Sequence, residues 1–371
     1  MLGLNRLSIQ SKLILLLLAV TLGSIATVGW IGYQSASSAL KDAAYNQLQG
    51  IRVAKTDALK AMLEAIRDQA ISFSDSQACL NGMVALRAAY KELQSTAKLD
   101  AGQQKALEDF YAKTFIPGLD KMVEGTPQVS QYMPTNPVEA YLQYHYIAAN
   151  PGQYLKKQEM DVAPGDKSPY SAAHQKFHKL FARAASVFGY EDVMLIDAET
   201  LDVIYSFQKS TDFATNLESG PYSNSNLAEA MRKLRKTRDV DDFKVVDFEP
   251  YRPNWGAPMG FVASPIFDGP RMIGLLALQF PISNFNRITT GNFNWKAEGL
   301  GDTGECYLVG PDKTMRSRSR FMYENPKAFV AEMRERGLPR AAMDQIERQG
   351  NVLNAMPVQT ISVEKALQGQ Q

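Results

Sequence analysis

The chain of 371 residues is longer than one hydrophobic core usually organises, so its length predicts two or more domains. Its 40 basic and 39 acidic residues leave a net charge of +1, which excludes the strongly basic balance of a nucleic-acid-binding protein. The two cysteines, Cys79 and Cys306, exclude a disulfide framework and have no metal-type spacing, although their pairing with each other stays open.

The first element in chain order is an uncharged, largely apolar run over residues 13–33. About 20 apolar residues cross the hydrocarbon core of a bilayer, so this run predicts a transmembrane helix. Trp30 and Tyr33 lie at its far end, where aromatic rings favour the membrane interface. Basic residues precede it, which predicts that residues 1–12 are cytoplasmic and that the rest of the chain lies outside the inner (plasma) membrane.

A cleaved signal peptide is the alternative interpretation of this segment. Ser24, Ile25 and Ala26 resemble the small-residue cleavage site that follows an apolar core. However, the apolar run continues beyond Ala26, and no proline interrupts the chain before Pro117. Both features favour a helix that is retained as a membrane anchor.

Residues 34–189 are predicted to form a long helix and a helical region. Apolar residues recur at steps of three and four from Leu40 to Phe73, which is the period of one helical face. At 1.5 Å per residue, a helix over residues 34–74 is about 60 Å long. Its apolar face packs either on a second copy of the chain or on its own domain, and the pattern leaves both open. Further helices are expected within residues 80–125 and over 169–188.

Residues 190–290 are predicted to form a β-rich lobe. The five candidate strands are residues 193–196, 203–207, 243–248, 261–266 and 272–280. Turns rich in Asp, Gly and Pro join the first two strands and the last two. A charged amphipathic segment over residues 227–236 predicts a helix that covers the sheet. These elements predict an α+β fold with an antiparallel, PAS-like sheet.

A second, incomplete lobe of the same kind is expected over residues 291–371. Residues 194–197 and 307–310 share one pattern, an apolar strand followed by a polar turn and a second strand. Strands are therefore expected at 306–309 and 314–319, followed by helical sequence over 326–349. Three further strands of a complete lobe are missing, so we expect the chain to be a piece of a longer protein.

Tyr251, Arg252 and Trp255 cluster in a loop before a strand, where binding residues concentrate. An arginine can bind a carboxylate through paired N–H donors, and a tryptophan can cover an apolar group or a cation. Tyr205 and Asp268 are candidates for the same pocket. The structural alternatives are a surface loop closed by Arg252 and Trp255, and a tight turn that uses Asp268.

Two further motifs carry less functional weight. His174 and His178 share one helical face, which suits a metal ion, but the sequence offers no third ligand, so we expect no metal site. Gly299, Gly301 and Gly304 match the spacing of a nucleotide fingerprint, yet they precede a strand and therefore predict a turn. With no GxSxG motif and no P-loop in the sequence, we expect neither catalytic residues nor a cofactor.

Three segments resemble, as a set, the double Cache sensor family of bacterial transmembrane receptors. They are residues 190–197 (YEDVMLID), 263–269 (ASPIFDG) and 301–309 (GDTGECYLV), and residues 8–13 (SIQSKL) with the long helix are similar too. The resemblance covers the whole chain. It implies a ligand-sensing input module of a homodimeric receptor, flanked by two membrane spans, with the ligand in the membrane-distal lobe at residues 190–290.

The resemblance also implies an output domain beyond this chain. Receptors of this family carry a nucleotide cyclase, a histidine kinase, a methyl-accepting signalling domain or a phosphatase, and we favour a class III adenylate or guanylate cyclase. An anchored periplasmic solute-binding protein is the alternative to a signalling module.

One departure from the family bears on the ligand. Amino-acid-binding members use Arg-x-Trp-Tyr, Tyr-x-Asp and a later Asp that holds the ligand amine, whereas the matching segments here are 252–255 (RPNW), 266–268 (IFD) and Gln279. A neutral amide cannot supply the charge-assisted bond that an ammonium group favours. The resemblance therefore implies a small-molecule ligand other than a standard amino acid. The ligand-binding candidates are Tyr205, Tyr251, Arg252, Trp255, Asp268 and Gln279.

Overall fold

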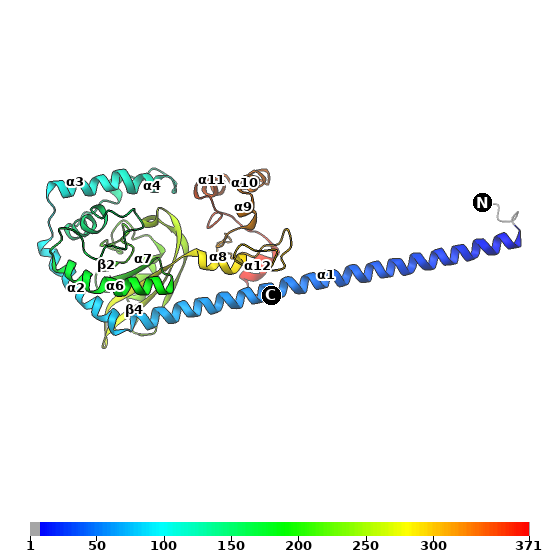
Figure 1. Ribbon diagram of the computed structural model, residues 1–371, viewed down its shortest axis with the longest axis horizontal. Coiled ribbons are helices and arrows are strands. Elements are labelled where there is room, and N and C mark those ends of the chain that lie inside the picture. Colours follow the sequence, from blue (N-terminus) through cyan, green and yellow to red (C-terminus); the bar gives the residue numbers. More distant parts are fainter. Residues whose placement is uncertain (1–7, 371) are drawn as a thin grey trace.

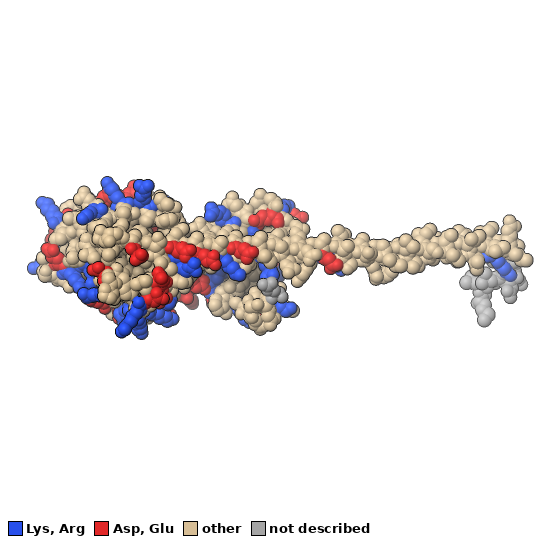
Figure 2. Space-filling model, turned by 90° about the horizontal axis from the view of Figure 1, so that it is seen from below, with Lys and Arg blue, Asp and Glu red and all other residues tan. Residues whose placement is uncertain are grey.

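The computed structural model describes residues 8–370, and its longest element is helix α1, Ile9–Ser74. Ser8 caps this helix by accepting a hydrogen bond from the backbone N–H of Ser11. Figure 1 shows α1 running along the folded part of the chain and projecting far beyond it, and Figure 2 shows the projecting part almost free of charged side chains. Within residues 8–370, α1 is the one helix long and apolar enough to cross a membrane.

The folded part contains a five-stranded antiparallel sheet, so the predicted α+β class is confirmed. The strand order is β2-β1-β5-β4-β3. All five strands expected from the sequence form, and β3 and β4 are longer than predicted. They are β1 Asp192–Asp197, β2 Val203–Ser206, β3 Lys244–Tyr251, β4 Ala257–Asp268 and β5 Arg271–Phe280.

Both faces of the sheet are covered, because alternate residues of each strand point to opposite sides. In β1, Val193 and Leu195 join a core that includes α1, α2 and α6, whereas Met194 and Ile196 join a core beneath α7. These helices are α2 Gln77–Thr96, α6 Pro169–Phe188 and α7 Asn226–Leu234. The predicted helices over 169–188 and 227–236 correspond to α6 and α7.

Short helical segments between α2 and α6 form a cap, whose buried side chains join the same core as α1, α2 and α6. In Figure 1 the first of these segments, labelled α3 and α4, lie at the edge of the folded part opposite α1. The cap comprises α3 Ala101–Phe110, the π-helix η2 Tyr111–Phe115, α4 Ile116–Asp120, the 3₁₀ turn η3 Val129–Gln131, α5 Pro137–Gln143 and the π-helix η4 Tyr144–Ala148. Both π-helices are single turns continuous with α-helices, which is the usual form of this rare structure.

The C-terminal unit follows helix α8, Ile282–Thr290, and corrects the expected second lobe. The strands predicted at 306–309 and 314–319 do not form. In their place, Val309 and Met315 make an isolated antiparallel bridge, and Thr314 makes another with Pro357. These pairings stop at single bridges, and residues 291–370 contain no strand that would extend them into a sheet.

Helices instead build the core of the C-terminal unit. Met315, Phe329, Met333 and Ile346 pack together there. The helix predicted over 326–349 divides in two between Gly337, which has a positive φ, and Pro339. The helices are α9 Arg320–Glu324, α10 Pro326–Glu335, α11 Arg340–Gln349 and α12 Ile361–Leu367.

Helix α1 contacts both the sheet and the segment after α8. Near its end, Ile66 and Ala70 are buried in the sheet core, so this part of the predicted apolar face packs on its own domain. Closer to the N-terminus of the helix, Leu40, Tyr45 and Leu48 are exposed. The C-terminal part of α1 therefore packs on its own domain, whereas the apolar residues nearer the N-terminus remain available for a second copy of the chain.

Candidate functional site

A pocket of about 220 Å³ lies where β3 ends. The 3₁₀ turn η5, Arg252–Asn254, carries the chain from β3 towards β4 at this point. One wall of the pocket comes from residues 249–253, and the other comes from residues within 221–226, just before α7. Tyr251 and Arg252, both predicted from the sequence, line this pocket, which we call the Arg252 pocket.

Arg252 is exposed at the pocket and is held in place by the cap. Its guanidinium donates a hydrogen bond to the hydroxyl of Tyr132, with an N–O distance of 2.7 Å. The ring of Tyr132 in turn packs on Tyr222, which also lines the pocket, with 6.0 Å between ring centroids. The guanidinium is therefore oriented but retains free N–H donors, the arrangement required to bind a carboxylate.

Tyr251 and Tyr222, which line the pocket, take part in a buried hydrogen-bond network behind it. The Tyr251 hydroxyl donates to Asp212 at 2.6 Å, and the Ser210 hydroxyl donates to the other carboxylate oxygen at 2.7 Å. Burial raises the pKa of Asp212, and these two hydrogen bonds oppose that shift. The hydroxyls of Thr211 and Tyr222 lie 2.6 Å apart beside it. With its partners satisfied, this network fixes the position of Tyr251.

Trp255 packs into the cap and does not line the Arg252 pocket. Its indole N–H donates to the Phe115 carbonyl at 3.1 Å, and its ring contacts Tyr154 with 5.1 Å between centroids. Its φ of 55° is left-handed, which ends the η5 turn. A side chain at Gly118 would overlap the indole, so this glycine is required for the contact. Trp255 thereby positions the chain that carries Arg252.

Tyr205 lies in the core beneath α6. Its hydroxyl is 2.7 Å from Nδ1 of His178, while Nε2 of His178 lies 2.6 Å from the Gln158 carbonyl. The rings of His174 and His178 stack at 4.5 Å between centroids. Burial, assisted by the charge of Lys209, lowers the pKa of His178 to about 4, so the ring is neutral near pH 7. Residues 8–370 contain no group of three side chains arranged to hold a metal ion.

The remaining two candidates lie elsewhere on the sheet. Asp268 is exposed in the β4–β5 turn opposite Arg271, as its turn chemistry predicts. Gln279 is buried on β5, where its Nε2 lies 3.3 Å from a Glu191 carboxylate oxygen and its Oε1 finds no partner within residues 8–370. The structure thus brings Tyr251 and Arg252 together and places the other four predicted residues outside their pocket.

Sequence reasoning missed a larger pocket of about 540 Å³ on the other side of Pro221, which lines both cavities. Cap residues within 130–139 and sheet-side residues within 202–221 form its walls, including Glu139 and Asp202. We call it the Glu139 pocket. In the sequence, Glu139 follows Asn136 and Pro137, which is an ordinary helix start. That pattern carries no sign that the carboxylate is buried, so no sequence signal could have found it.

Comparison of the chain with protein-family models, with curated proteins and with solved structures finds no match. The function is therefore inferred from the residues and geometry of the chain itself.

Proposed function

We propose that this chain is the ligand-sensing input module of a membrane-anchored receptor. The observation that carries the proposal is the continuity of α1, because one helix supplies both the membrane-length segment and a packing face for the sheet. A ligand that favours one packing of the sheet on α1 would shift the helix relative to the membrane. A few kcal/mol of differential affinity is enough for such a population shift.

Polar contacts couple α1 to the domain at three levels. The Ser74 hydroxyl donates to Ser264 of β4 at 3.0 Å, and Tyr190, just before β1, donates to Gln69 at 2.6 Å. Closer to the membrane-length segment, the Lys55 ammonium binds the segment after β5. A displacement of β4 therefore has a direct path to α1.

The resemblance to double Cache sensors supports the same role. In that arrangement the PAS-like lobe at residues 190–290 lies outside the inner membrane, and the output domain, with a nucleotide cyclase as our first choice, lies beyond this chain. The exposed apolar residues Leu40, Tyr45 and Leu48 of α1 suit the seam of a homodimer. A histidine kinase or chemoreceptor output would use the same input.

The chemistry of the Arg252 pocket favours a small carboxylate ligand. The free donors of Arg252 supply a charge-assisted contact, and the side chains of Tyr251 and Tyr222 form part of the pocket wall. A volume of about 220 Å³ suits a molecule of a few heavy atoms.

A thermal-shift screen of the 371-residue chain in detergent tests the proposal. Binding raises the melting temperature by mass action, so carboxylates can be screened without knowledge of the output. We expect a carboxylate hit that Arg252→Ala abolishes and Arg183→Ala, an exposed arginine on α6, retains. Hits that are indifferent to Arg252→Ala would overturn the assignment of this pocket.

Hydrogen exchange separates a sensor from an anchored solute-binding protein. A sensor ligand should alter amide exchange in α1 over residues 55–74, where the helix contacts the sheet and the segment after α8. Binding that leaves this stretch unchanged would favour solute binding without signalling.

A further inference from the structure

Glu139 is a buried carboxylate without a partner. It is 7% exposed, and its Oε1 is buried with no hydrogen-bond partner within residues 8–370. Its side chain also forms no ion pair with any described lysine, arginine or histidine. A buried charge without a partner is unfavourable, and proteins usually pair such groups or keep them neutral.

The surroundings of Glu139 are acidic and lack a compensating cation. Asp202 lines the same pocket, where one of its oxygens accepts a hydrogen bond from the Asn216 side chain at 2.8 Å. No lysine or arginine is among the described residues that line the pocket. The titratable groups that interact with Glu139 are Asp202, Tyr90 of α2 and Tyr111 of η2, and none of them is basic.

Burial, together with the charge of Asp202, raises the pKa of Glu139 to about 8. Without a cation beside it, this carboxyl group is therefore protonated near pH 7. An approaching positive charge favours the ionised form, so a cation would bind with release of a proton to solvent.

We propose that the Glu139 pocket binds a small organic ammonium ion, with Glu139 and Asp202 as its two anionic partners. The volume of about 540 Å³ accommodates a molecule rather than a bare ion. The described residues offer no group of three metal-ligating side chains, which disfavours a divalent cation. The walls also include Met133, Ala214 and Pro221, whose apolar surface suits the methylene groups of an alkylamine.

The Glu139 pocket adjoins the Arg252 pocket, but it offers carboxylates where the Arg252 pocket offers a guanidinium. Pro221 lines both cavities, and the cap residues 130–139, which contribute to the Glu139 pocket, include Tyr132, the partner of Arg252. An ammonium ion at Glu139 would therefore order the segment that orients Arg252. The proposed binding itself does not depend on a signalling role for the chain.

Isothermal titration of the full chain in detergent tests this proposal. The probes are 1,4-diaminobutane and its homologues from two to ten carbons, with 1,4-butanediol as the neutral match and Mg²⁺ and Ca²⁺ as the metal arm. We expect saturable binding of at least one amine near pH 7. In two buffers of different ionisation enthalpy, the heats should differ by an amount that shows proton release.

Matched variants locate the site. Glu139→Gln and Asp202→Asn should each weaken amine binding at least tenfold, and Glu139→Gln should also abolish the proton release. Glu159→Gln, which removes an exposed carboxylate before α6, should change neither. Thermal unfolding of each variant confirms that it is folded.

Several results would overturn the proposal. They are the absence of saturation by every amine at 10 mM, equal binding of the diol, tighter binding of Mg²⁺ or Ca²⁺ in competition with the amine, and full affinity in Glu139→Gln. Arg252→Ala distinguishes the two pockets, because amine binding should survive it while binding of a carboxylate at Arg252 should not.

Discussion

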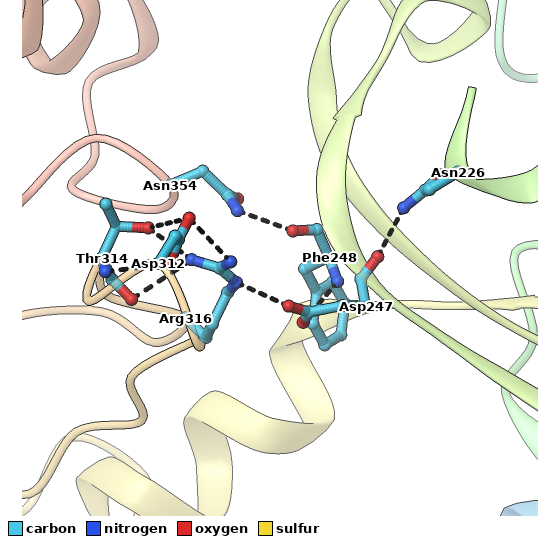
Figure 3. Close-up of polar contacts among 7 residues, drawn as sticks. All are labelled: Asn226, Asp247, Phe248, Asp312, Thr314, Arg316 and Asn354. Atoms are coloured by element: carbon cyan, nitrogen blue, oxygen red, sulfur yellow. Dashed lines mark hydrogen bonds and ion pairs between the residues drawn. The ribbon is translucent and has the colours of Figure 1, made fainter. Parts of the chain in front are cut away.

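The guanidinium of Arg316 lies 3.0 Å from the carboxylate of Asp247, and this ion pair joins the C-terminal unit to the edge strand β3 (Figure 3). Beside it, the Asn354 amide donates to the Phe248 carbonyl at 2.6 Å. On its other side, β3 is bound to α7, because Asn226 donates to the Asp247 carbonyl at 2.7 Å. The C-terminal unit thus binds β3, the strand that ends at the Arg252 pocket.

We expect Arg316→Met to weaken the contact between the C-terminal unit and β3. Arg316 is buried and also contacts Asp312 at 3.0 Å, so its removal leaves two carboxylates without their cation. Hydrogen bonds to charged groups contribute roughly 1.5–3 kcal/mol, so the variant should melt a few degrees lower. Amide exchange in residues 244–251 should accelerate, as measured by mass spectrometry.

Arg318→Met is the control for this variant, since Arg318 is exposed two residues away and makes no ion pair with the described sheet. Unchanged exchange in β3 of the Arg316 variant would show that the C-terminal unit does not restrain the strand.

Substitution of Lys55 should weaken the attachment of α1 to the rest of the chain. Its ammonium is buried and donates to the Ile288 carbonyl and the Glu298 carboxylate, both at 2.6 Å. Lys55→Met keeps the length of the side chain but leaves both acceptors unpaired, so it should destabilise by about 1–3 kcal/mol. Thermal unfolding measures the loss, and Lys60→Met, an exposed lysine on the same helix, should leave the melting temperature within about a degree. Equal melting of the two variants would contradict a structural role for this contact.

The strands were predictable because their signal is local. In β1 and β5, apolar residues run between turn residues, and pairing within the sheet then satisfies the backbone. The same signal failed at Val309 and Met315, because a strand also needs neighbouring strands to satisfy its backbone, and residues 316–370 offer no further strands. Local pattern predicts the state of a segment but not its partners.

The site was predictable only in part for the same reason. Tyr251 and Arg252 are adjacent in the chain, so loop composition located both of them. Tyr205 has a residue type suited to binding, yet its burial under His178 depends on how α6 packs on β2. Glu139 and Asp202 are far apart in sequence and meet only through the cap. Contacts between distant segments are the part that pattern reasoning could not supply.

Gly118→Ala should displace Trp255 and disturb the Arg252 pocket without removing any polar group. The added methyl group overlaps the indole, so the ring must move away from the Phe115 carbonyl that it binds. We expect a red-shifted tryptophan emission and weaker carboxylate binding at Arg252. Gly102→Ala, at the exposed start of α3, is the control and should leave both unchanged. A Gly118 variant with native emission would indicate that the cap absorbs the methyl group elsewhere.

The ionisation of Glu139 should make the stability of the folded chain depend on pH. Its pKa is raised by burial to about 8 in the folded chain, above the ordinary value of 4.5. Between these values the folded chain keeps a proton that the unfolded chain loses, so stability falls as pH rises through this window. The contribution is fully present below pH 4.5 and is lost by about pH 8, at a rate of at most about 1.4 kcal/mol per pH unit.

Glu139→Gln removes this proton while preserving the shape of the side chain. The variant should therefore gain stability relative to the native chain as pH rises, with its melting temperature several degrees higher at pH 8 than the native value and close to it at pH 5. Melting curves at half-unit steps from pH 5 to 8.5 measure the difference, and Glu159→Gln should track the native chain throughout. Parallel curves for Glu139→Gln and the native chain would mean that Glu139 ionises normally, and the pocket would then already hold a compensating charge.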